Sequence, residues 1–165
     1  MRVETDKQRW PVRRSLYLFL VFIVMAGIFF FSSMQGNESS AMSGRVAEWL
    51  TRVIYPDFSA MSAEQKKGAL QLMGYVVRKC AHFTEYALLG ASLVLLFSTF
   101  SFKFRSWIAL LLTALYAVSD EWHQGFVAGR APMARDVLID TAGAAFGIMI
   151  VVLFILSRRK EQNSE

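Results

Sequence analysis

The stretch SWIALLLTALYAVSDEWHQGFVAGR, residues 106–130, begins as an apolar run and ends in two acids, a histidine and an arginine. Its first part, 106–119, carries no charge, and three more charge-free runs lie at 15–37, 86–102 and 141–157. A membrane-spanning helix needs about 20 mostly apolar residues. The four runs therefore predict an all-α, polytopic membrane protein with four transmembrane helices.

Composition and charge agree with a membrane protein. Hydrophobic residues make up 55% of the 165 residues, and the mean hydropathy is positive, at +0.36. The net charge of +5 comes from basic clusters at the ends of the apolar runs, at 7–14, 103–105 and 158–160. Such clusters are typical of cytoplasmic flanks rather than of a nucleic-acid surface, so no nucleic-acid partner is expected. Cys80 is the single cysteine, which excludes an intrachain disulfide.

The basic clusters predict the topology of a single domain that covers residues 1–165. Both termini are expected in the cytoplasm, and the first apolar run is expected to remain as an uncleaved helix. Ser62 and Gln65 have capping-box spacing, and Pro56 separates two amphipathic stretches in the long outer loop. The expected elements are helix one at about 15–34, an extracytoplasmic amphipathic segment at 43–78, and helices two, three and four at 81–102, 106–125 and 137–157.

The charge-free parts of helices two, three and four are shorter than a full crossing. Each inner end is fixed by basic residues, so each helix must extend outward through charged residues. This extension brings polar residues of three helices together at the outer side. The residues below the outer boundary are Glu85, Asp120, Glu121, His123 and Asp140, and those around it are Lys79, His82, Arg130, Arg135 and Asp136.

Helical spacing places some of these residues on shared faces. Arg78, His82 and Glu85 recur on one face of helix two. On helix four, Asp136 and Asp140 share a face with the G-x-x-x-G of 143–147, which permits close approach of a neighbouring helix. The sequence therefore predicts that the acids of helix four lie close to another helix.

Asp120 and Glu121 lie at the C-terminal end of helix three, where the helix dipole disfavours negative charge. They need compensation from Lys79, Arg130 or Arg135, from a shared proton, or from a bound cation. Three interpretations stay open: a polar network that locks the bundle, a histidine–carboxylate acid/base site, and a divalent-metal site. The ligands in the metal hypothesis are His82, Glu85, Glu121 and His123.

Two motifs, RKCAHFTEYALLG at 78–90 and SDEWHQGFVAGRAPMARDVLIDTAGAAFG at 119–147, resemble the VanZ family of bacterial membrane proteins. SSMQG at 32–36 is similar to the S-S-Q element of that family, with Gln35 in the place of its glutamine. Ala128 stands where the family commonly has proline. The resemblance implies a polytopic membrane protein, and the family's namesake is associated with low-level resistance to the glycopeptide teicoplanin. The family's polar positions correspond here to Lys79, His82, Glu85, Asp120, Glu121, His123, Gln124, Arg130, Asp136 and Asp140.

The sequence thus leads to three functional hypotheses, and it leaves open whether the protein is an enzyme and in what oligomeric state it exists. The first is an outer-face site that acts on a lipid-linked or envelope substrate and contributes to teicoplanin-type resistance. The second is a binder of a lipoglycopeptide or a lipid head group, and the third is a structural membrane partner. Candidate acid/base or pocket residues are His82, Glu85, Asp120, Glu121, His123 and Asp140, and candidate substrate-binding residues are Lys79, Gln124, Arg130, Arg135, Asp136 and Gln35.

Overall fold

The computed structural model describes the backbone of residues 2–162 and the side chains of 12–162 except that of residue 37. Within these residues every regular element is helical, which confirms the all-α prediction. Residues 7–11 of the N-terminal basic cluster lie outside the described side chains. The elements are α1 (Arg2–Ser33), α2 (Gly36–Ile54), the 3-10 helix η1 (Phe58–Ala60), α3 (Ala63–Phe97), α4 (Arg105–Gln124) and α5 (Ala134–Gln162).

The longest helix, α3, joins two segments that the sequence analysis treats separately. At its start, Gln65 N donates to Ser62 Oγ at 3.3 Å and Ser62 N donates to Gln65 Oε1 at 2.9 Å, so the predicted capping box is confirmed. From there α3 runs unbroken to Phe97, whereas the sequence analysis ends an outer segment at 78 and extends helix two to 102. Because no proline interrupts α3, nothing in its backbone chemistry ends the helix between the two segments.

The closest helix pairing in the fold is between α3 and α5. Gly143 lies against Phe83, and Gly147 lies against Ala87, so closely that an added Cβ would overlap the opposite backbone. The close approach predicted from the G-x-x-x-G spacing is thereby confirmed. It brings the acids of α5 next to the polar residues of α3.

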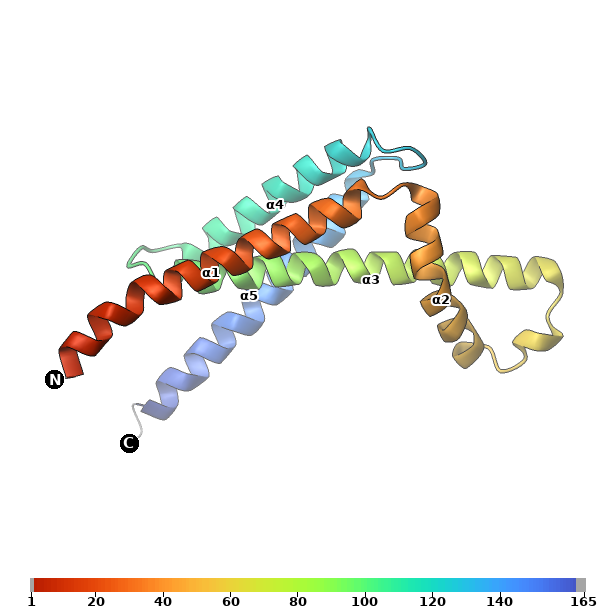
Figure 1. Cartoon of the computed structure of the whole chain (residues 1–165). Helices are drawn as coiled ribbons and strands as arrows, with labels where there is room; N and C mark the ends of the chain where they lie inside the picture. The colour runs from red at the N-terminus through yellow and green to blue at the C-terminus, as the bar shows by residue number, and fades with distance from the viewer. Residues whose placement is uncertain (1, 163–165) are drawn as a thin grey trace.

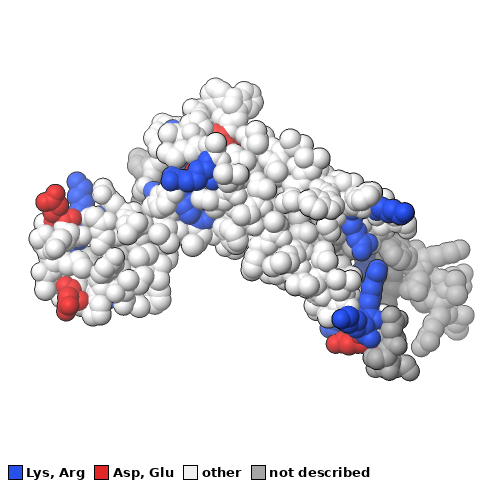
Figure 2. Space-filling model, turned by 180° about the vertical axis from the view of Figure 1, so that it is seen from behind, with Lys and Arg blue, Asp and Glu red and all other residues white. Residues whose placement is uncertain are grey.

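The outer surface of the helices is largely apolar. Three described helices are long and apolar enough to cross a membrane, namely Val12–Ser33 of α1, α3 and α5. By the same measure of length and hydropathy, α4 is not a candidate membrane span. Leu111, Leu115 and Trp122 nevertheless form an exposed apolar row along this helix. Figure 2 shows wide uncharged surface between groups of charged side chains. This exposed apolar surface is typical of a membrane protein.

Charged residues gather at one end of the helices. In Figure 1, α1 begins and α5 ends at the same end of the molecule, where the turn between α3 and α4 also lies. Arg14 donates to the carbonyl of Thr99 at 2.9 Å and lies 4.5 Å from the ring centre of Phe100, so α1 is tied to this turn. We call this the basic end, and its described basic residues are Arg13, Arg14, Lys103, Arg105, Arg158, Arg159 and Lys160.

The opposite end holds the α1–α2 junction and the α4–α5 loop, and α2 runs from it across α3 (Figure 1). Ala47 and Thr51 of α2 are buried, whereas Val46, Trp49 and Val53 on another face are exposed. The helix is therefore amphipathic, with an apolar row that no described element covers. We call this end the polar end, because the polar residues predicted to converge lie there.

Candidate functional site

The α4–α5 loop is fastened to the end of α1 by backbone contacts at the polar end. The guanidinium of Arg130 donates to the carbonyls of Met34 at 3.0 Å and Phe31 at 2.9 Å. Gly36 N donates to the carbonyl of Ala128 at 3.1 Å, and Gly36 packs against Gly129 with no room for a Cβ. The φ of +76° at Gly129 favours glycine. These contacts hold the cationic loop against α1.

Burial lowers the pKa of the Arg130 guanidinium from its ordinary value, and the nearby Asp120 carboxylate opposes this shift. Arginine nevertheless stays protonated in proteins. Arg130 therefore keeps a positive charge at the polar end while its donors hold the loop in place.

Asp120 is buried in a hydrogen-bonded network between α1 and α4. Its Oδ2 accepts from Ser32 Oγ at 2.8 Å and from Gln124 Nε2 at 3.1 Å, and Gln124 also donates to Ser32 at 3.0 Å. A buried carboxylate is strongly destabilising unless such donors surround it. The sequence analysis did not identify Ser32, although its place in the S-S-Q-like element could have pointed to it.

The carboxylate of Glu121, the neighbouring acid, accepts its hydrogen bond from the backbone rather than from side chains. Its Oε1 accepts from the backbone N–H of Met133 at 3.0 Å, directly before α5 begins. A carboxylate is favourable at a helix N-terminus because the helix dipole is positive there. Among the described residues, neither Asp120 nor Glu121 forms an ion pair within 4.0 Å. Their hydrogen bonds thus come from neutral donors, and of the cations proposed in the sequence analysis Arg130 attracts both carboxylates without a direct ion pair.

One ion pair and one histidine–carboxylate contact connect α3 with α5. Lys79 Nζ lies 2.5 Å from Asp136 Oδ2, and one turn further His82 Nδ1 lies 4.0 Å from Asp140 Oδ1. Asp140 is only 3% exposed, and its Oδ1 has no hydrogen-bond partner among the described residues. The close α3–α5 packing thus places a buried carboxylate behind a half-buried imidazole.

The second histidine, His123, lies in another environment. Its ring stacks on Phe29 with centres 4.8 Å apart, and its Nε2 lies 3.2 Å from Ser33 Oγ. His123 does not line the cavities described below, whereas His82 lines both. Among the described residues, no three of His, Cys, Asp and Glu are grouped closely enough to hold a metal ion. The ligand set of the metal hypothesis, His82, Glu85, Glu121 and His123, is thus not assembled in this fold.

Two adjoining cavities open at the polar end, and four residues line both of them. The polar chamber has a volume of about 250 Å³, and the apolar chamber has a volume of about 260 Å³. The shared residues are Ser39, Arg78, His82 and Arg130.

The two chambers differ in chemistry. The polar chamber adds Lys79 and Arg135 to the shared arginines, and its one acid, Asp136, is already paired with Lys79. The apolar chamber adds five apolar side chains and a single acid, Glu85. The apolar residues are Phe31, Met42, Val46, Val77 and Ala81. A cationic compartment thus continues into an apolar one, with His82 at their boundary.

The structure brings most, but not all, of the predicted site residues to these chambers. Lys79, His82, Glu85, Gln124, Arg130, Arg135 and Asp136 line one or both. Asp120, Glu121 and Asp140 support the site from behind. Gln35 is exposed at the N-cap of α2 and lines neither chamber. The sequence analysis did not identify Ser39, because a serine among several others in a polar stretch carries no signal of its own.

Comparison with known proteins places the chain in a family. No curated protein and no solved structure matches it. The sequence profile of VanZ/LLP1 matches residues 17–155, which include all five α-helices in whole or in part and both cavities. The prediction of a VanZ-like protein is thereby confirmed, and the chain belongs to the VanZ/LLP1 family.

Proposed function

We propose that this protein crosses the bacterial cell membrane four times, with α4 as the additional span and both termini in the cytoplasm. The 20 residues of α4 measure about 30 Å, which matches the hydrocarbon core of a bilayer. Asp120 and Glu121, which lower its hydropathy, are buried inside the protein rather than directed at lipid. The basic end then lies in the cytoplasm, and the polar end and α2 lie at the outer face.

In this orientation the protein binds the anionic head group of a lipid-linked envelope substrate. One observation carries this proposal: the cationic polar chamber and the apolar chamber adjoin and share Arg78, His82 and Arg130. A ligand with a negative head and a hydrocarbon tail satisfies both chambers at once. A soluble anion would leave the apolar chamber unfilled, and a neutral lipid would leave the arginines uncompensated.

His82 is the group best placed for chemistry on such a ligand. It lies at the boundary of the chambers, where head and tail of the ligand join, with Asp140 4.0 Å behind its Nδ1. An imidazole with a carboxylate close to one ring nitrogen is a common arrangement of a general acid/base. We therefore assign His82 as the acid/base in the enzymatic form of the proposal.

The second candidate is a binder that performs no reaction. One observation favours this binder: Asp120 and Glu121, two of the candidate acid/base residues, are engaged in hydrogen bonds that serve the fold. In that case the protein sequesters or presents the lipid-linked molecule. Both forms lead to the same physiological proposal, a contribution to resistance against teicoplanin-type glycopeptides, with which the family's namesake is associated.

Lipid binding by the purified protein tests the proposal. Native mass spectrometry of detergent-solubilised protein, titrated with phosphatidylglycerol or phosphatidylcholine, should show preferential retention of the anionic lipid. The R78Q/R135Q double variant should bind phosphatidylglycerol at least tenfold more weakly, because two cations of the polar chamber are lost. The matched control K103Q/R159Q, with both changes at exposed residues of the basic end, should bind as the wild type does. An equal loss of phosphatidylglycerol binding in both double variants would contradict the proposal. Equal retention of phosphatidylglycerol and phosphatidylcholine by the wild type would contradict it as well.

A His82→Ala variant separates the enzyme from the binder. Membrane lipids from a deletion strain complemented with wild type or H82A are compared by mass spectrometry, and teicoplanin susceptibility is measured in parallel. An enzyme predicts a lipid product that H82A fails to make although H82A still binds phosphatidylglycerol. A binder predicts identical lipid profiles. Unchanged teicoplanin susceptibility of the deletion strain would remove the resistance part of the proposal.

A further inference from the structure

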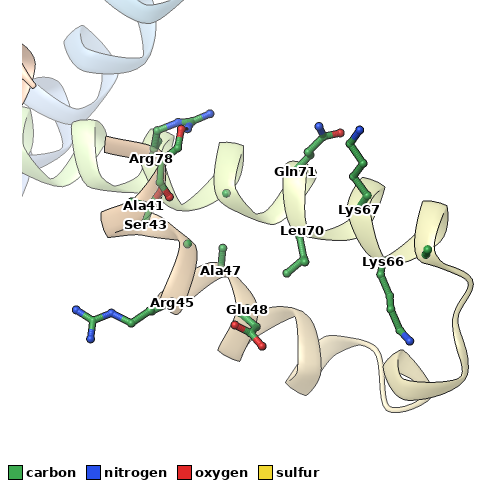
Figure 3. Close-up of a pocket in the computed structure, with 14 residues that line it drawn as sticks. Ala41, Ser43, Arg45, Ala47, Glu48, Lys66, Lys67, Leu70, Gln71 and Arg78 are labelled. Atoms are coloured by element: carbon green, nitrogen blue, oxygen red, sulfur yellow. The ribbon is translucent and has the colours of Figure 1, made fainter. Parts of the chain in front are cut away.

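A third cavity, larger than both chambers, lies between α2 and the outer half of α3. Figure 3 shows α2 crossing α3 near Arg78 and diverging from it toward η1, so that the two helices enclose a wedge-shaped space. We call this cavity the wedge, and its volume is about 980 Å³. Ala47 and Leu70 point into it from the two helices (Figure 3).

The charged residues of the wedge are mostly basic. Arg45, Lys66, Lys67 and Arg78 line it, and its single acid, Glu48, is paired with Arg52 at 2.7 Å. None of the four cations forms an ion pair in the described part of the chain. Lys66 and Arg78 instead donate to neutral oxygens, at 2.9 Å and 2.8 Å. The wedge therefore carries positive charge that no acid of the described residues neutralises by an ion pair within 4.0 Å.

The wedge is continuous with the two chambers. Arg78 lines all three cavities, Ser40 lines the wedge and the polar chamber, and Ser43 lines the wedge and the apolar chamber. Figure 3 shows Lys67, Gln71 and Arg78 on one side of α3 and Leu70 on the side that faces α2, so the three polar residues lie along the edge of the wedge. From Lys66 to Arg78 the helix rises about 18 Å, so the polar residues of the wedge extend well beyond the chambers.

We propose that the wedge is an extended subsite for the extracytoplasmic part of the lipid-linked substrate, a linear chain with repeated anionic groups. This inference rests on the proposed function, and it narrows the substrate class. The tail occupies the apolar chamber, the first anionic group lies at Arg78, and the chain continues between α2 and α3 toward Lys66 and Lys67. A phospholipid with a single head group would leave the wedge empty and its cations uncompensated.

Two lipids that differ only in this extension test the inference. The probes are phosphatidylglycerol and a diacylglycerol-anchored hexamer of glycerol phosphate, each titrated into the full-length protein and followed by native mass spectrometry. The wild type should bind the anchored hexamer at least tenfold more tightly. R45Q/K67Q, which alters two exposed residues of the wedge that line neither chamber, should lose this gain and keep its affinity for phosphatidylglycerol. K103Q/R159Q should keep both affinities.

Other results would overturn the inference in distinguishable ways. Equal binding of both lipids by the wild type, or a gain that survives in R45Q/K67Q, overturns the wedge subsite and leaves the proposed function standing. Loss of both affinities in R45Q/K67Q shows that the wedge is no separate subsite. Absence of binding to either lipid overturns the proposed function itself.

Two further probes define the ligand chemistry. A diacylglycerol that carries an uncharged hexasaccharide should show no gain, and an equal gain with this probe overturns the requirement for anionic groups. The free glycerol phosphate hexamer should bind at least tenfold more weakly than the anchored one, because it cannot fill the apolar chamber. Equal binding of the free hexamer overturns the assignment to a lipid-linked chain.

Discussion

At the scale of single residues, two buried acids of the polar end, Asp120 and Glu121, accept hydrogen bonds from neutral donors. Asp120 lies between the hydroxyl of Ser32 and the amide of Gln124, two groups that also bond to each other. Such a closed network offsets part of the desolvation cost of the carboxylate. Ser32 therefore matters more than a serine at the end of an apolar helix would suggest.

The adjacent serines of α1 provide a matched test of this network. Ser32→Ala removes a donor to a buried carboxylate and should lower stability by about 1–2 kcal/mol. Ser33→Ala, at an exposed position, should change stability by no more than about 0.5 kcal/mol. Thermal unfolding of the purified variants in detergent measures both effects, and equal melting temperatures for the two variants would rule out the proposed role of Ser32.

At the scale of elements, the site depends on how closely α3 and α5 approach each other. Glycines at 143 and 147 remove the side chains that would separate the two helices. The same approach brings Lys79 to Asp136 and His82 to Asp140. Small residues at the helix interface are thus a condition for the polar contacts between α3 and α5.

A single added methyl group tests this dependence. In Gly147→Ala the new Cβ would overlap the backbone of Ala87, so the helices must move apart at a cost of about 1–3 kcal/mol. Gly27→Ala is the control, since nothing lies within 4 Å of its Cβ, and the higher helix propensity of alanine should leave stability equal or slightly increased. Melting temperatures in detergent report both changes. If Gly147→Ala were as stable as the wild type, the tight α3–α5 contact would be refuted.

At the scale of the whole molecule, the distribution of charge separates two functional ends. Basic residues gather where α1 begins and α5 ends, at one end of the molecule, and α2 and the α4–α5 loop lie at the other end (Figure 1). Residues of these two segments line the chambers, and α2 also lines the wedge. Apolar surface covers the helices between the two ends. A bilayer that fits this surface would leave the chambers at its outer boundary, where a lipid-linked ligand has both its tail and its head group.

Thiol labelling in intact cells tests this orientation. Cys80 is exposed, so a Cys80→Ala background is needed before single cysteines are introduced. A membrane-impermeant maleimide should label Ser62→Cys in whole cells, and it should label Lys103→Cys only after permeabilisation. Arg159→Cys should behave like Lys103→Cys, because both positions lie at the basic end. The reverse pattern would place the chambers in the cytoplasm and contradict the proposed substrate.

Comparison with the sequence analysis separates local information from tertiary information. The capping box of Ser62, the membrane character of the helices and the role of the glycines at 143 and 147 followed from residues close together in the chain. The sequence analysis divided α3 into an outer segment and a membrane helix, because hydropathy marks where a helix enters lipid and not where it begins. The different neighbours of the two histidines, Asp140 for His82 and Phe29 for His123, could not be predicted either. They depend on the rotation of each helix about its axis.

The sequence by itself determined that this chain is an all-helical membrane protein of the VanZ type, with its polar residues gathered toward one end. These properties follow from hydropathy, charge and helical spacing, which can be read from residues close together in the chain. Only the tertiary structure decided that Asp120 is satisfied by Ser32, that His82 and not His123 lines the chambers, and that Arg78 joins three cavities. Such relations join residues that are distant in the chain, and they are set by the packing of helix against helix, which local patterns do not encode.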